Sequence, residues 1–119
     1  MPHSLFSSEW RQSQQEYLRL QVLAGWQKLV AQYYQQGQYT DASLINQKVL
    51  ALDPLNEAAH QQQMRIYLAA DQRSQAVQQY RLYAQILEHE LGVAPSAEAT
   101  ALLQQANEAA RKGPTHKAA

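Results

Sequence analysis

The sequence predicts an all-α protein of about five helices. Ala, Leu, Gln and Glu, which are good helix formers, make up much of the 119-residue chain. Apolar residues recur at steps of three and four, the spacing that places them on one side of a helix. A shift of 34 residues superimposes Tyr33 on Tyr67 and Ala42 on Ala76, so the pattern also repeats. Together these observations favour stacked helix pairs.

The first helix is expected from about Glu9 to Gln36. The segment Gln36-Gly37-Gln38 ends it, because glycine adopts the left-handed conformation that closes a helix. Its apolar residues form a stripe so wide that we expect it to be buried on two sides. Gly25 lies within the stripe and indicates a kink or the close approach of another helix. The stripe consists of Tyr17, Leu18, Leu20, Val22, Leu23, Trp26, Leu29, Val30 and Tyr33.

The second and third helices follow the turn at Gly37. The second ends at Asp53-Pro54, and the third is expected over Leu55 to Ala70. Asp53 can accept hydrogen bonds from the free N–H groups at the start of the third helix, and Pro54 suits the first helical position because it has no N–H. One face of the second helix carries Ala42, Ile45, Val49 and Leu52.

A fourth helix is expected over Asp71 to Leu91, with Gly92 ending it. Ser96 is expected to cap the fifth helix, and Glu98 in the first turn interacts favourably with the helix dipole. The fifth helix is expected to direct Leu103, Ala106 and Ala110 inward.

The 34-residue period is that of tetratricopeptide (TPR) helix pairs. In such pairs aromatic residues fill the groove between two helices, a small residue lets them touch, and a proline ends the second helix. We therefore expect a TPR-like right-handed superhelix with a long first helix, two helix pairs and a C-terminal capping helix. Chance periodicity in an amphipathic bundle is the alternative. The TPR-like packing positions are Trp26, Leu29, Tyr33, Gly37, Tyr39, Ala42, Pro54, Tyr67, Ala76 and Tyr80.

The chain length suits a single domain with one core. We expect a flexible N-terminus at residues 1–8, a helical domain at residues 9–110, and a disordered basic tail at residues 111–119. The tail carries three cations, which give only weak attraction to phosphates.

The order and spacing of several motifs resemble the bacterial transcriptional activator domain. The resemblance covers roughly residues 6 to 105 and departs from the family at Gln63, Ala70-Asp71 and Ala99. It implies a helical TPR-like module of bacterial transcription regulators, including SARP-type antibiotic regulators. Such modules usually follow a winged-helix DNA-binding domain or sit in signal-transducing ATPases; we expect neither a winged helix nor a phosphate-binding loop here. The motifs are Trp10, GQYTDA at 37–42, LDPLNEAAH at 52–60, Met64, Tyr67, Ala76, Tyr80, Leu87 and ELGVAPSAE at 90–98.

Charge and composition exclude several functions. Ten basic and ten acidic residues cancel, and 20 glutamines give a neutral polar surface, so direct nucleic-acid binding by this segment is not expected. The chain has no cysteine and no long apolar run, which favours a cytoplasmic protein without membrane contact. We expect no enzymatic activity, no cofactor and no metal site.

Two histidines could be ligands or acid–base groups, or could have only a structural role. His60 occupies the large packing position between helices, so we interpret it as a core residue and not as a ligand. The residues of Glu88-His89-Glu90 point in different directions from a helix, so we interpret them as a solvated face. No G-x-S-x-G motif supports a hydrolase. Core positions are also expected for Tyr33, Tyr67, Tyr80 and Tyr83.

The candidate functional surface is a groove along the first helices of the two pairs. An exposed Tyr, an Arg and several amides suit an extended peptide or a partner helix. The expected function is a non-catalytic scaffold that binds a protein partner: transcription machinery, a DNA-binding or ATPase domain of the parent protein, or a second copy. The alternative is a small-ligand sensor with a pocket near Trp26 and Tyr83. The groove consists of Gln27, Tyr34, Gln61, Arg65 and Leu68, with Ala31 and Gln35 beside them.

Overall fold

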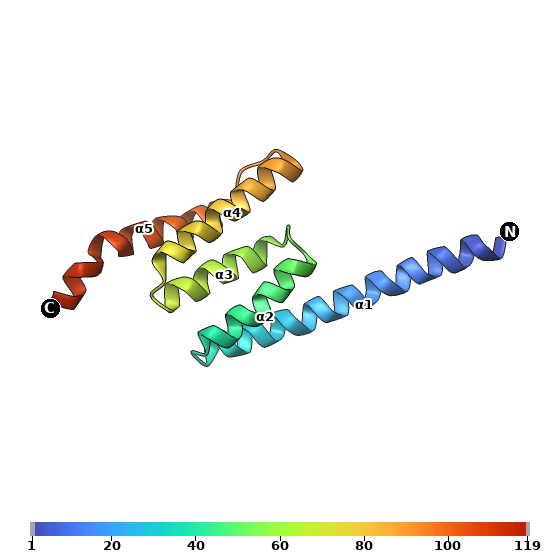
Figure 1. The fold of residues 1–119 in the computed structure, drawn as a ribbon, viewed down its shortest axis with the longest axis horizontal. Coiled ribbons are helices and arrows are strands. Elements are labelled where there is room, and N and C mark those ends of the chain that lie inside the picture. Colours follow the sequence, from blue (N-terminus) through green and yellow to red (C-terminus); the bar gives the residue numbers. More distant parts are fainter. Residues whose placement is uncertain (1, 119) are drawn as a thin grey trace.

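The computed structural model describes the backbone of residues 2–118 and the side chains of residues 9–108. These residues form five helices and no strands, which confirms the all-α prediction (Figure 1). The helices are α1 (Pro2–Gln35), α2 (Tyr39–Leu52), α3 (Glu57–Ala69), α4 (Arg73–Leu91) and α5 (Ala97–Ala118).

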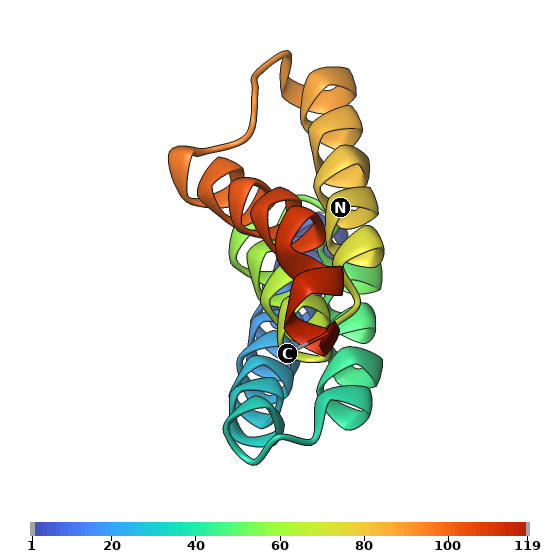
Figure 2. The same ribbon diagram turned by 90° about the vertical axis from the view of Figure 1, so that its left-hand side faces the viewer.

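The helices pack in chain order as two pairs, α1 with α2 and α3 with α4, and α5 lies against α4 and α3 (Figures 1 and 2). The N-terminal half of α1 extends beyond the other helices (Figure 1). The molecule is therefore elongated, with extents of 74 × 34 × 17 Å and a radius of gyration of 18.2 Å. A compact chain of this length would have a radius of gyration of about 13–14 Å. The handedness of the superhelix stays a prediction.

The turns inside the two pairs have the same geometry. Gly37 has φ 76° and Asp71, 34 residues later, has φ 61°. At the first turn the N–H of Gln38 donates to the carbonyl of Tyr33 at 2.9 Å. At the second turn the N–H of Gln72 donates to the carbonyl of Tyr67 at 2.7 Å. Each bond satisfies a carbonyl that the end of the helix would leave free, so the repeat seen in the sequence is present in the backbone.

The start of α3 differs from the prediction. The helix begins at Glu57, and its cap is Asn56, whose side chain accepts from the N–H of Ala59 at 3.0 Å. Asp53 instead follows the last residue of α2 and its carbonyl accepts from the N–H of Asn56 in the connecting turn. Pro54 thus lies in this turn and not at the first helical position.

The end of α4 and the start of α5 lie where the sequence predicts them. Gly92 ends α4 in the left-handed conformation with φ 66°. Ser96 caps α5, because its hydroxyl accepts from the N–H of Ala99 at 3.3 Å. The inner face of α5 differs by one residue: Leu102 is buried, whereas Leu103 is half-buried. The inward residues of the described part of α5 are Ala99, Leu102 and Ala106; the side chain of Ala110 lies outside the described residues.

Three clusters of buried residues form the core. One joins α1, α2 and α3 through Leu23, Val49 and Ala59, with Trp26 packed against it. The second joins the same helices through Val30, Ala42 and Ile66, with Tyr33 packed against it. The third joins α4 and α5 and consists of Tyr83, Leu87 and Ala99, with Tyr80 at its side. Among the other TPR-like positions Ala76 is buried, Leu29 and Tyr67 are half-buried, and Pro54 is exposed.

The wide apolar stripe of α1 is buried on one side only, contrary to the prediction. Leu23 and Val30 are buried, but Leu18 is 58% exposed and Val22 is 42% exposed. The reason is that Leu18 and Val22 lie on a different side of α1 from Leu23 and Val30, the residues that pack against α2 and α3, so no described helix covers them. Gly25 neither kinks the helix nor meets another helix, since α1 is continuous and a Cβ at Gly25 would have no atom within 4 Å.

Helices α1 and α5 reach almost to the two ends of the chain. The backbone of α1 begins at Pro2, and that of α5 ends at Ala118. The side chains of residues 1–8 and 109–119 lie outside the described residues, so the flexible N-terminus and the basic tail stay predictions. Within the described part of the chain, no helix is long and apolar enough to cross a membrane.

Candidate functional site

Residues from three helices surround a depression on one face of the stack. Tyr34 lies in the last turn of α1, Arg65 and Leu68 lie on α3, and α5 contributes the opposite wall. Figure 2 shows α5 crossing in front of α3. We call this region the α1–α3–α5 surface. It is lined by Tyr34, Arg65, Leu68, Ala69, Leu102 and Gln105.

Tyr34 is held in place by aromatic and aliphatic contacts. Its ring centroid lies 5.8 Å from that of Tyr39, and the two rings are tilted by 56°, an arrangement that aromatic pairs favour. Tyr34 also packs against the buried cluster of Val30, Ala42 and Ile66. The ring is therefore half-buried and fixed in position.

Arg65 is half-buried beside Leu68, and it makes no hydrogen bond or ion pair with any residue that the structure describes. A guanidinium keeps its charge at every physiological pH and has five donors arranged to hold a carboxylate. Here that charge lies among apolar and amide side chains. The surface can therefore bind a carboxylate through Arg65 and apolar groups through its neighbours.

The other predicted groove residues have separate places. Gln27 lines a second depression, between α1 and α3, together with Val30, Ala31, Asn46, Ala58, Ala59 and Gln62. Gln61 is buried, and its amide donates to the hydroxyl of Ser96 at 3.2 Å. The sequence placed Gln61 on the groove, but the start of α5 covers it. Gln35 is exposed at the end of α1.

A buried polar network between α2 and α3 was not predicted. The Asn46 amide donates to the carbonyl of Ala59 at 2.8 Å and to Gln63 Oε1 at 2.9 Å, and the Gln63 amide donates to Ser43 Oγ at 2.7 Å. Because these polar groups are partnered, their burial is tolerated. The signal in the sequence was Asn46, a polar residue one step from the apolar Ile45 and three from Val49.

His60 and Tyr83 form a second buried polar cluster between α3 and α4. Their rings stack at 4.4 Å between centroids. His60 Nε2 lies 2.7 Å from the Pro54 carbonyl, and His60 Nδ1 lies 2.9 Å from the Gln79 amide nitrogen. Burial lowers the pKa of His60 because a charged ring would lose its hydration. The interpretation of His60 as a core residue agrees with this burial.

Tyr83 donates a hydrogen bond to Glu57 Oε1 at 2.6 Å. Its pKa is raised, first by burial and then by the hydrogen bond and the negative charge of Glu57, all of which disfavour a phenolate. Trp26 and Tyr83 pack in different core clusters, so they do not share the walls of one ligand pocket.

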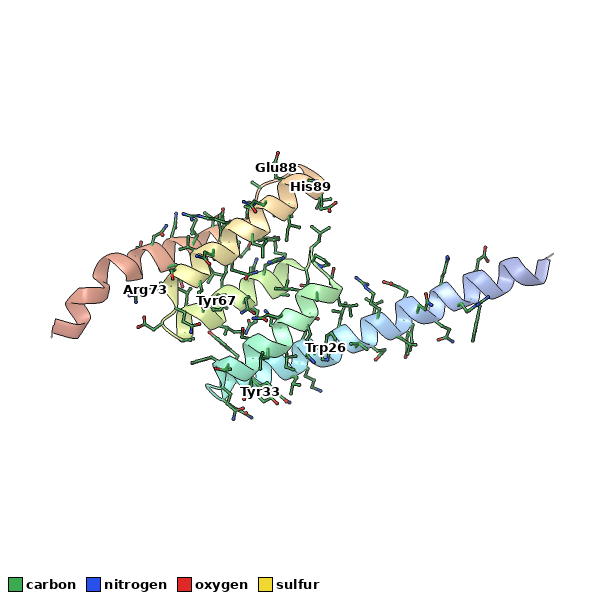
Figure 3. All side chains as sticks on the ribbon, viewed as in Figure 1. Trp26, Tyr33, Tyr67, Arg73, Glu88 and His89 are labelled. Atoms are coloured by element: carbon green, nitrogen blue, oxygen red, sulfur yellow. The ribbon has the colours of Figure 1, made fainter. Side chains whose placement is uncertain are left out.

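The other cluster of ionisable residues is solvent-exposed. Glu88 and His89 lie near the end of α4 (Figure 3), and His89 Nδ1 lies 3.7 Å from Glu90 Oε1 with both side chains exposed. Among the described side chains, no group of three His, Cys, Asp or Glu residues could hold a metal ion.

Comparison with known proteins identifies one similarity. The model of a family described as the bacterial transcriptional activator domain matches residues 2–112. No curated protein and no solved structure matches the chain.

Proposed function

Because the chain belongs to the bacterial transcriptional activator domain family, which makes it a helical domain of the kind found in transcription regulators, we propose that it is a non-catalytic scaffold. In this proposal it binds a protein partner through the α1–α3–α5 surface. The partner belongs to the transcription machinery or carries the DNA-binding or ATPase activity of the same regulator.

The observation that carries the proposal is the environment of Arg65. This charged side chain is half-buried without an ion-pair partner among the described residues, and it lies beside Leu68. The residues that dominate the energy of protein interfaces are typically Arg, Tyr and Trp surrounded by apolar contacts. Tyr34 and Leu102 supply such contacts from two other helices. An acidic residue of the partner, flanked by apolar residues, complements this surface.

Nucleic acid is a poorer ligand for the same surface. Arg65 is the only cation among its lining residues, and the whole chain has a formal net charge of zero. Binding to a phosphate backbone depends on several cations that release counterions. The proposal therefore assigns this domain a role in protein contacts and leaves DNA binding to the partner.

The proposed mechanism is positional. Side chains from α1, α3 and α5 form one surface, so a partner that fills it contacts the first pair, the second pair and the capping helix at once. A bound partner stabilises one arrangement of the two helix pairs and the capping helix, because its binding energy includes contacts with each of them. The domain thereby keeps a DNA-binding or signalling unit in its active position.

The test uses Tyr34→Ala combined with Arg65→Glu. A partner is first identified by co-purification with the full chain and is then purified. Its dissociation constant with the natural chain and with the double variant is measured by calorimetry. We expect an increase of at least about 100-fold, because the change removes an aromatic anchor and reverses a charge.

The matched control is Arg81→Glu, which reverses the charge of an exposed arginine on α4 that does not line this surface. It should leave the dissociation constant within about twofold of the natural value. Circular dichroism verifies that both variants remain helical. Equal affinities for the natural chain and the double variant would refute the proposal.

A further inference from the structure

Between Leu18 and Leu29, α1 carries an apolar stripe that faces away from its own chain. Leu18, Val22, Gly25 and Leu29 are spaced by four, three and four residues, which places them on one side of the helix. We call them the outer stripe. Leu18 and Val22 are exposed, Gly25 is exposed, and Leu29 is half-buried. Leu23 and Val30, which face the core, lie about 120° away around the helix.

The internal repeat identifies this side of α1 as a packing side. A shift of 34 residues places Gly25 on Ala59, Leu29 on Gln63 and Gln32 on Ile66. In α3 these equivalent residues contact the preceding pair. Ala59 packs with Leu23 and Val49, Ile66 packs with Val30 and Ala42, and Gln63 bonds to Asn46. The same side of α1 has no preceding pair to contact within the described residues.

The outer stripe is complementary to itself. In an antiparallel pair centred between Val22 and Gly25, Leu18 of one copy lies opposite Leu29 of the second copy. Val22 then lies opposite Gly25, so a branched side chain meets the position that has none. A Cβ at Gly25 would have no atom within 4 Å, so a second helix can approach closely there. Gln15 and Gln32, which continue the stripe, also face each other.

The charges around the outer stripe are compatible with this pairing. The stripe and its two flanking glutamines are uncharged. Arg19 is engaged within its own chain, 3.0 Å from Glu16 and 3.6 Å from Asp53. Lys28 lies about a quarter turn away from the stripe, and in the antiparallel pair the two copies of Lys28 are separated by about 13 Å along the helix, beyond the screening length at physiological salt.

From this self-complementarity we propose that the outer stripe is a homodimer interface, in which α1 of one copy pairs antiparallel with α1 of a second copy. The interface is distinct from the α1–α3–α5 surface and does not depend on the function proposed for it. It involves few side chains, so the dimer should be weak and form as the protein concentration rises.

The test measures the mass of the full chain by analytical ultracentrifugation over a series of concentrations. The natural chain should move from its monomer mass of 13.5 kDa toward twice that value. Gly25→Gln should raise the dimer dissociation constant at least about tenfold, because its side chain occupies the space that Val22 needs. The variant should remain folded, since Gly25 has no neighbour within the chain and Gln is the better helix former.

The matched control is Ala24→Gln, which adds the same side chain to the adjacent exposed residue of α1, outside the stripe. It should leave the dissociation constant within about twofold. A natural chain that stays monomeric at every concentration, or a Gly25→Gln chain that dimerises like the natural one, would overturn the proposal.

Disulfide trapping tests the orientation, because the chain has no cysteine of its own. A mixture of Leu18→Cys and Leu29→Cys chains should form a disulfide between the two variants. Leu18→Cys alone should not, since the antiparallel pair separates its two thiols by about 16 Å along the helix, too far for a disulfide. A Leu18→Cys disulfide between identical chains would contradict the antiparallel pairing.

Discussion

The first helices of the two pairs, α1 and α3, hold equivalent positions in the repeat but have different surroundings. α3 lies between α2 on one side and α4 and α5 on the other, whereas α1 contacts mainly α2. As a result α3 buries the polar residues His60, Gln61 and Gln63, while α1 exposes the apolar Leu18 and Val22. Burial in this molecule therefore depends on a residue's place in the stack more than on its hydrophobicity.

The difference is possible because the buried polar groups of α3 have partners. Gln61 bonds to Ser96, Gln63 to Asn46 and Ser43, and His60 to the Pro54 carbonyl and Gln79. No buried side-chain nitrogen or oxygen of the described residues lacks a hydrogen bond. Since an unpartnered buried polar group costs about 1–3 kcal/mol, these bonds allow α3 to occupy the middle of the stack. They also fix its position against specific neighbours on both sides.

The largest effect is expected from the same substitution at the equivalent positions 25 and 59. Ala59 is 2% exposed and packs against Leu23 and Val49. Ala59→Gln forces α2 away and buries an amide, which should lower the free energy of unfolding by about 3 kcal/mol. Gly25→Gln should raise the free energy of unfolding by up to about 1 kcal/mol, since Gln favours the helix more than Gly does.

Urea denaturation followed by circular dichroism measures both changes, at a concentration where the chain is monomeric. Equal destabilisation by the two substitutions would show that the side of α1 at Gly25 is packed against other residues, as the side of α3 at Ala59 is. The proposed difference in the surroundings of α1 and α3 would then be wrong.

The next effect concerns positions 26 and 60, which carry Trp26 in the first pair and His60 in the second. Burial lowers the pKa of His60 below its ordinary value of 6.5. Below pH 6.5 the unfolded chain therefore binds a proton that the folded chain excludes, and stability falls as the pH falls toward the folded pKa. The slope should reach up to about 1.4 kcal/mol per pH unit.

Urea denaturation between pH 7.5 and pH 5.5 measures this slope. His60→Phe should remove it, although the variant is less stable at neutral pH because Gln79 loses a partner. The control is His89→Gln, which changes an exposed histidine and should retain the slope. A His60→Phe chain with the natural pH dependence would mean that another group is responsible.

Much of the fold could be predicted because local signals decide it. The left-handed turns at Gly37 and Gly92 and the cap at Ser96 follow from the preferences of single residues. The start of α3 could not be decided in this way. Asp53 and Asn56 are both good caps, so the preference of a single residue does not decide between them, and it is the Asn56 side chain that accepts from the N–H of Ala59.

The candidate surface could be predicted only in part. Tyr34, Arg65 and Leu68 were identified from the faces of two helices, and these three residues do line one depression. Leu102 and Gln105 were missed, and Gln61 was misplaced, because the path of α5 across α3 is a tertiary property. Periodicity shows which side of α5 is apolar, but not which helix that side meets.

The smallest effect on stability is expected at the two left-handed turn positions, which are occupied by Gly37 in the first pair and by Asp71 in the second. Gly37 adopts positive φ without strain, whereas the side chain of Asp71 costs about 1 kcal/mol there. Asp71 is partly compensated by an ion pair with Arg73 at 2.6 Å, worth less than about 1 kcal/mol because both groups are solvent-accessible. Asp71→Gly should therefore change the free energy of unfolding by less than about 0.5 kcal/mol in the natural chain.

In an Arg73→Ala background the ion pair is absent, so Asp71→Gly should stabilise the chain by about 1 kcal/mol. Gly37→Asp should destabilise it by a similar amount, because the residue equivalent to Arg73 in the first turn is Tyr39, which has no charge to offer. Thermal unfolding of the four combinations at positions 71 and 73, a double-mutant cycle, separates the two contributions. If Asp71→Gly has the same effect with and without Arg73, the ion pair contributes nothing to stability and does not offset the backbone strain at Asp71.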